Sequence, residues 1–180
     1  MLKKVFLAVL ALVGSASLAN AQEIFSKGTS AINAGVGIGS YLSNLSIPPL
    51  SVSLDYGVAD NLINGNNGSI SIGGYVGYTA SSATFYNSKF NASYAILGAR
   101  GAFHYQVAPK LDTYAGLMLG YNIVSSSWSG AEYNSLASAA SGVALGGYLG
   151  ARYFFTENIG AFGELGYSIA YLNLGVTFKL

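Results

Sequence analysis

The chain ends in Asn173-Leu174-Gly175-Val176-Thr177-Phe178-Lys179-Leu180, the stretch that decides its fold. Apolar residues alternate there with polar residues or glycine at a strict period of two, the pattern of a β-strand with two different faces. The apolar series begins at Leu172 and runs to the last residue without a polar tail. Such an exposed strand edge would invite aggregation in a water-soluble protein. We therefore expect this strand to be paired within a membrane-embedded sheet.

The other end of the chain has the features of a secretory signal peptide. Lys3 and Lys4 precede an apolar run from Val5 to Val13, and Ala19-Asn20-Ala21 follows as a small-x-small cleavage site. The apolar run is too short to be a membrane-spanning helix. We predict cleavage after Ala21, which leaves residues 22–180 as a single mature domain.

The composition also favours a membrane protein built from strands. Hydrophobic residues make up 52% of the chain and charged residues only 8%, whereas soluble domains have about 25% charged residues. No stretch of the mature chain has the run of about 18 apolar residues that a transmembrane helix requires. The 24 glycines and 14 tyrosines are typical of a narrow barrel with aromatic residues at the membrane interfaces.

Charge and cysteine content exclude several other classes. The predicted mature chain has six Lys and Arg against seven Asp and Glu, a net charge of −1 that offers no basic surface for nucleic acid. The chain has no cysteine, so it has neither disulfides nor thiolate metal sites.

Eight alternating segments can be placed along the mature chain, each near the roughly 9–11 residues that cross a bilayer as a tilted strand. We therefore predict an all-β fold, an eight-stranded antiparallel up-and-down transmembrane β-barrel. The segments are Ser30–Gly39, Leu50–Val58, Ser69–Tyr78, Ser93–Tyr105, Asp112–Ile123, Gly142–Tyr153, Gly160–Ser168 and Ala170–Leu180.

An even strand number places both chain ends on one side, which we predict to be the periplasm. Three long connections then face outward, namely Ser40–Pro49, Thr79–Ala92 and Val124–Ser141. Two short periplasmic turns are predicted at Gln106–Leu111 and Phe154–Ile159. Long outer and short inner connections are typical of these barrels. Ala59–Gly68 is long for a periplasmic turn, and the last outer connection, near Ile169, is very tight.

The parity of the strands predicts an uncharged lipid-facing surface with two rings of aromatic residues. Lys or Arg at the midplane of that surface would cost about 2–4 kcal/mol. Outward aromatics gather near both ends of the strands, as interfacial girdles require. The outer girdle is predicted to contain Tyr78, Tyr121 and Tyr167, and the periplasmic girdle Tyr56, Phe103, Tyr105, Tyr153 and Phe178.

The opposite parity predicts a polar interior in which six charges balance: Asp55, Asp112 and Glu164 against Arg100, Arg152 and Lys179. Side chains fill the interior of an eight-stranded barrel, and buried charges must be paired. We therefore favour a structural network over an ion path, with Arg100–Glu164 and Arg152 beside an acidic residue at its core. Other residues predicted to face inward are Asn33, Ser51, Ser53, Tyr75, Tyr94, His104, Tyr114, Met118, Tyr148, Phe162, Tyr171, Asn173 and Thr177.

The residues do not predict a catalytic or metal site. His104 is the only histidine and, without Cys or clustered carboxylates, is a poor metal ligand. Gly-x-Ser-x-Gly is absent from the sequence. We therefore expect a non-enzymatic protein without a cofactor or metal.

The outer loops are where a specific partner could bind. Tyr41, Trp128 and Tyr133 lie in these loops, and exposed aromatics of this kind can form a contact patch. The alternative is that they pack over the mouth of the barrel.

The last strand also resembles the C-terminal signal by which outer-membrane β-barrels are recognised for insertion. Its signal residues are Asn173, Gly175, Phe178 and Leu180, with Leu180 in place of the usual terminal aromatic. The mature chain is similar to small barrels of the OmpX/OmpA-transmembrane-domain type. This resemblance implies Sec export to the outer membrane of a Gram-negative bacterium, insertion by the barrel-assembly machinery, and contact with outer-membrane lipid.

The same resemblance implies a structural or surface-interaction role rather than catalysis. The leading hypothesis is a barrel with a plugged polar lumen that contributes to envelope integrity or to surface contact through its loops. The alternative hypothesis is a narrow porin-like channel for ions or small solutes. Both need a hydrophilic interior, so the sequence does not separate them.

Overall fold

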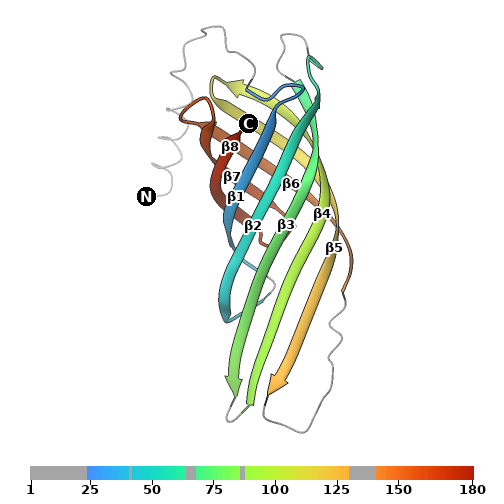
Figure 1. Cartoon of the computed structure of the whole chain (residues 1–180), viewed down its shortest axis with the longest axis vertical. Helices are drawn as coiled ribbons and strands as arrows, with labels where there is room; N and C mark the ends of the chain where they lie inside the picture. Colours follow the sequence, from blue (N-terminus) through green and yellow to red (C-terminus); the bar gives the residue numbers. More distant parts are fainter. Residues whose placement is uncertain (1–23, 41, 64–67, 86–87, 130–140) are drawn as a thin grey trace, which may run out of the picture.

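The computed structural model describes residues 24–40, 42–63, 68–85, 88–129 and 141–180, and the predicted signal peptide lies outside these residues. Eight antiparallel strands form a closed barrel in chain order (Figure 1). The described residues contain no helix with the length and hydropathy needed to span a bilayer. The strands are β1 (Ser30–Ile38), β2 (Leu45–Ala59), β3 (Gly68–Phe85), β4 (Ser88–Ala108), β5 (Leu111–Ser129), β6 (Gly142–Phe154), β7 (Ile159–Gly166) and β8 (Leu172–Lys179).

The terminal strand that decides the fold closes the barrel. β8 pairs with β1 from Ala31↔Lys179 to Ile38↔Leu172, and with β7 on its other side. Both of its edges are therefore hydrogen-bonded, which removes the exposed edge that the sequence pattern would otherwise present. The predicted fold class, an eight-stranded antiparallel barrel, is confirmed. We call the end of the barrel that holds Ser30 and Lys179 the near end, and the opposite end the far end.

Three of the eight strands run well beyond the others at the far end. β3, β4 and β5 contain 18, 21 and 19 residues, whereas β7 and β8 contain eight each. Figure 1 shows the β3–β4 hairpin and the end of β5 projecting past β1 and β8. We call this projection, residues 79–85, 88–93 and 124–129, the ridge.

The ridge corrects two of the predicted outer loops. Most of Thr79–Ala92 is a continuation of β3 and β4, and Val124–Ser129 continues β5. The alternation of apolar residues stops before these strands do. Serine, threonine and asparagine outside the bilayer can still pair their backbones in a sheet, so the ladder continues after the apolar pattern ends. Similarly, β2 begins at Leu45 rather than at Leu50.

The last outer connection is longer than predicted and changes one assignment. β7 ends at Gly166 and β8 begins at Leu172, so residues 167–171 form a loop that is closed by the Gly166 amide donating to the Tyr171 carbonyl. Tyr171 was predicted to face inward, but it is 48% exposed because it belongs to this loop and not to the strand. Ile169 and Ala170 fill the interior in its place.

The outside of the barrel is an apolar belt. Strands β1 to β8 all present large hydrophobic side chains outward, with Leu117 at 67% and Leu145 at 72% exposure. A continuous apolar surface of this size is not stable in water, whereas it matches the hydrocarbon core of a bilayer. The barrel is thus built to span a membrane with its strands, and its polar groups face inward.

Candidate functional site

The middle of the lumen is crossed by Arg100 of β4. Its guanidinium makes ion pairs with Asp55 of β2 (Nε–Oδ1, 3.0 Å) and with Glu164 of β7 (Nη2–Oε2, 2.7 Å). The three side chains are almost completely buried. The Arg100–Glu164 pair that the sequence predicts therefore exists, although the two strands lie on different sides of the barrel.

Arg152 of β6 extends the network toward the near end. It pairs with Asp55 and also with Asp112 of β5 (Nη1–Oδ2, 3.3 Å). Asp55 thus forms ion pairs with two guanidiniums, and its carboxylate accepts hydrogen bonds from Arg152 and from Asn33 of β1. Arg152 and Asp55 have no exposed surface, and this network joins strands from opposite walls of the barrel.

Lys179 does not belong to this network, contrary to the prediction. None of the described ion pairs includes it, and its Nζ lies 5.5 Å from the centre of the Phe154 ring. Lys179 is the last residue of β8 and lies half-buried at the near end. Its long side chain extends there toward Phe154 and not toward the buried carboxylates. The buried network therefore contains five of the six predicted charges.

Two tyrosines pack over the guanidiniums. Tyr148 lies over Arg100, with the guanidinium carbon 4.0 Å from the ring centre, and Tyr114 lies over Arg152 at 4.5 Å. Both rings occupy space that opposite glycines leave open. A Cβ at Gly150 would come within 2.3 Å of the Tyr114 ring, and one at Gly116 within 2.4 Å of the Tyr148 ring.

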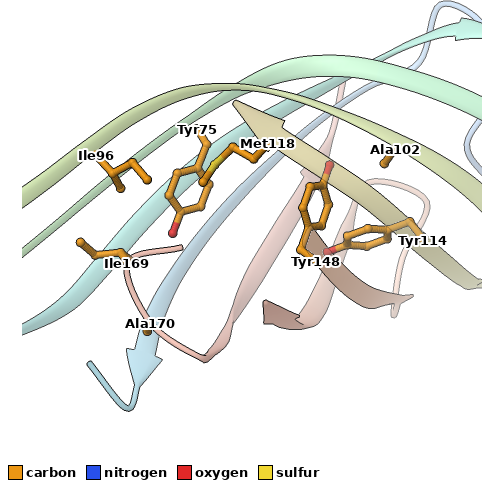
Figure 2. Packing of buried hydrophobic residues seen from close by; sticks show 8 residues of the cluster. All are labelled: Tyr75, Ile96, Ala102, Tyr114, Met118, Tyr148, Ile169 and Ala170. Atoms are coloured by element: carbon orange, nitrogen blue, oxygen red, sulfur yellow. The ribbon is translucent and has the colours of Figure 1, made fainter. Parts of the chain in front are cut away.

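A mostly apolar cluster packs in the lumen on the far-end side of this network. Ile169 and Ala170 of the last outer loop pack with Tyr75, Ile96 and Met118 of β3, β4 and β5. Figure 2 shows this cluster, with Tyr114 and Tyr148 at one end and Ile169 and Ala170 at the other. The far side of the lumen is therefore filled by a loop that folds inward.

The near end is filled by a segment that the sequence reading did not single out. Phe25 stacks on His104 with ring centres 4.2 Å apart. The Ser69 hydroxyl donates to the Phe25 carbonyl at 2.6 Å. The Ile24 amide donates to Gln106. In the sequence, the apolar pair Ile24-Phe25 shortly after the predicted cleavage site is the feature that could have indicated this buried contact.

His104 is held between a serine and a carboxylate. Its Nδ1 donates to Asp112 (3.0 Å to Oδ2), and its Nε2 lies 2.8 Å from the Ser71 hydroxyl. This order of groups resembles a hydrolase triad. However, all three side chains are about 1% exposed and Phe25 covers the imidazole, so no substrate carbonyl can approach Ser71. Arg152 also competes for Asp112. The arrangement serves as a hydrogen-bonded link between β3, β4 and β5.

No group of three or more His, Asp or Glu side chains in the described parts of the chain is arranged to hold a metal ion. The girdle and insertion-signal residues singled out in the sequence lie outside the buried ion network.

The eight girdle aromatics all lie on the outer surface of the barrel, with exposed fractions of 39% to 59%. Asn173 is buried inside, whereas Phe178 and Leu180 face outward. Tyr41, Tyr133 and the side chain of Trp128 lie outside the described residues.

The sequence matches no protein-family model and no curated protein. Three solved structures with a similar fold illustrate the likeness. A de novo designed transmembrane β-barrel is 16% identical, with 86% of this chain and 98% of that chain covered and a TM-score of 0.51. Ail, the attachment invasion locus protein of Yersinia pestis, is 13% identical over 86% and 99%, with a TM-score of 0.50. The outer membrane protein OprG from Pseudomonas aeruginosa is 11% identical over 88% and 99%, with a TM-score of 0.50. The chain therefore has the fold of small transmembrane barrels such as those of bacterial outer membranes.

Proposed function

We propose that the protein is a non-enzymatic integral barrel of the Gram-negative outer membrane whose lumen is plugged by its own side chains. Its role is to contribute to envelope integrity or to surface contact through its outer parts. In this proposal the near end faces the periplasm and the ridge projects outward from the cell.

The observation that carries the proposal is the ion network around Asp55. Arg100 and Arg152 both pair with its carboxylate, so side chains from β2, β4 and β6 meet in the middle of the bore. A conducting pore would need a continuous path of water past these groups. The pairs are buried, and removing one partner of such a pair is strongly unfavourable, which supports a static plug over a path that opens and closes.

Two further features support a closed lumen. The loop residues Ile169 and Ala170 fill it from the far end, and Phe25 fills it from the near end. The ridge supports a role at the cell surface, because it carries three hydrogen-bonded strands beyond the apolar belt. Segments that a folded scaffold holds out from its surface often carry binding residues.

Single-channel recording tests this proposal against the channel alternative. The purified barrel in a planar bilayer should show little steady conductance, because the network and both plugs block the bore. The double variant Arg100→Ala/Glu164→Ala, which removes a pair from the middle of the lumen, should leak. If the wild-type barrel conducts steadily and Glu164→Gln changes only its ion selectivity, the channel alternative is correct.

A further inference from the structure

At the far end, the hydrogen-bonded pairing of β6 with β7 stops earlier than the pairing of β6 with β5. The β6–β7 ladder ends at Tyr148↔Gly166, whereas the β5–β6 ladder continues to Asn122↔Gly142. Beyond the end of β7, the backbone hydrogen bond described on this side of β6 is the Tyr167 amide donating to the Gly147 carbonyl, and the Tyr167 carbonyl oxygen lies against Gly146. A gap in the wall is therefore present beside the upper part of β6.

This gap leads to a cavity of about 380 Å³, which we call the rim pocket. Small-molecule sites in proteins have volumes of roughly 300–1,000 Å³, so the rim pocket has room for a small ligand. Ile96 and Ser168, both buried, lie at its inner side. The residues that define the pocket are Tyr94, Ile96, Asn122, Ala144, Tyr167 and Ser168.

The polar groups of the rim pocket are neutral and include a buried acceptor. None of the described residues that line it is charged. The Asn122 side-chain oxygen is buried and receives no hydrogen bond from any described residue. A buried acceptor without a donor is unfavourable, so a ligand that brings a hydroxyl group would satisfy it. Tyr94 and Tyr167 add phenol rings, whereas the Ser168 hydroxyl already donates to the Ala170 carbonyl and accepts from Tyr75 and Asn173.

The mouth of the pocket opens toward the lipid side. Val143 and Leu145 line it and are 77% and 72% exposed on the outer face. Val143 pairs directly with Tyr121 of the predicted outer girdle, which places the mouth at the membrane interface. A ligand can therefore enter with a polar group in the pocket and an apolar part along β6.

We propose that the rim pocket binds a neutral, hydroxyl-rich ring, namely a sugar, either free or as the headgroup of a glycolipid. The aromatic rings can stack on the apolar face of a sugar, while the Asn122 side-chain oxygen accepts from one of its hydroxyls. The lack of cationic side chains disfavours a phosphate, which proteins usually bind with Arg or Lys. The pocket lies on the far side of Ile96 and Ile169, so the inference holds whether or not the lumen conducts.

The experiment uses the refolded full-length mature barrel in micelles of an amine-oxide detergent, whose headgroup has no hydroxyl. Methyl β-glucoside and octyl β-glucoside are titrated separately, and backbone amide shifts are followed by NMR. The expected result is saturable shifts at Tyr94, Asn122 and Ser168 with both glucosides. At least tenfold tighter binding of the octyl compound would identify a glycolipid headgroup as the source, and equal affinity would identify a free sugar.

Matched variants show whether the pocket itself binds. Asn122→Ala should weaken glucoside binding by several-fold to tenfold, as expected for the loss of one hydrogen bond. Leu117→Ala, on the same strand but facing lipid and outside the rim pocket, should leave the affinity unchanged. If Asn122→Ala does not fold, Tyr94→Phe removes one hydroxyl and should also weaken binding. The proposal is wrong if the amide resonances of the pocket residues do not shift up to the solubility limit of either glucoside. It is also wrong if Asn122→Ala and Tyr94→Phe bind the glucosides as tightly as the wild type does.

Discussion

At the scale of single residues, Asp55 is the centre of the buried structure. It is fully buried and touches Arg100, Arg152 and Asn33, which come from three other strands. An isolated carboxylate in this position would be strongly destabilised, but here two guanidiniums and an amide compensate its charge. The interior is consequently sensitive to the loss of any one partner.

The first prediction at this scale concerns Glu164. Glu164→Ala removes the 2.7 Å partner of Arg100 and should lower the free energy of unfolding by about 3 kcal/mol, the lower end for a broken buried pair, because Asp55 still contacts the guanidinium. Urea unfolding of the refolded barrel in detergent measures this loss. The double variant Arg100→Ala/Glu164→Ala should recover part of it. An unchanged urea midpoint in Glu164→Ala would contradict a structural role for the pair.

The second prediction concerns the space that glycine leaves for Tyr114. Gly150→Ala would place a Cβ 2.3 Å from the Tyr114 ring, which must then move away from Arg152 and Glu164. Overpacking of this kind typically costs about 1–3 kcal/mol, so the thermal unfolding midpoint should fall. Gly142→Ala is the matched control on the same strand, because nothing lies within 4 Å of its Cβ position. Equal thermal midpoints for the two variants would show that the Tyr114 ring is not tightly packed against Gly150.

At the scale of elements, the outer face of β5 shows where the membrane ends. Leu117, Leu119, Tyr121 and Ile123 face outward in succession, and Ser125 and Ser127 follow on the same face. Neighbouring strands change at the same level, since Ser125 pairs with Ser93, and Ser93 pairs with Ala80. One straight strand therefore passes from lipid to the polar side without a break in its hydrogen bonding.

This change from apolar to polar residues predicts that arginine has a different effect at two positions on the outer face of β5. Leu117→Arg places a charge in the middle of the apolar belt and should cost about 2–4 kcal/mol, so that less protein reaches the folded, membrane-inserted form. Ser125→Arg lies on the same face but in the ridge, and should insert like the wild type. Heat-modifiable gel mobility of membrane fractions measures the folded fraction. Normal insertion of Leu117→Arg would show that the apolar belt lies elsewhere.

At the scale of the whole molecule, eight strands bring the start of the first strand and the end of the last strand to one side of the barrel. β1 begins and β8 ends at the near end (Figure 1). Phe25, which precedes β1, is buried there against His104. Gly57 permits this arrangement, because a Cβ at Gly57 would lie 2.0 Å from the Ser26 carbonyl oxygen. The closure of the barrel, the position of Phe25 in the lumen and the projecting ridge are therefore properties of the assembled barrel rather than of any single strand.

The orientation of the molecule is tested with single cysteines, since the chain has none. Ser127→Cys lies in the ridge, and Lys110→Cys lies in the turn between β4 and β5 at the near end. In intact cells a membrane-impermeant thiol reagent should label Ser127→Cys and not Lys110→Cys. Labelling of both should follow once the outer membrane is permeabilised. The reverse pattern in intact cells would show that the barrel is inserted the other way round.

The sequence by itself determined the features that repeat with the period of a strand. Alternation gave the strand number and the inward face of Asp55, Arg100, Asp112, Arg152 and Glu164, because each wrong parity would place a charge in lipid. It also placed the girdle aromatics on the outside. These conclusions depend only on residues that are neighbours along the chain.

Only the tertiary structure decided which of these residues meet and where the strands end. Ion pairs between β4 and β7 join walls on different sides of the barrel, and the sequence carries no local mark of such contacts beyond charge balance. The ridge was missed because hydrophobic alternation reports lipid rather than backbone pairing, which continues through serine and asparagine. The inward return of Phe25, the inward loop at Ile169 and the rim pocket beside a short β7 all arise because strands of unequal length close into one barrel.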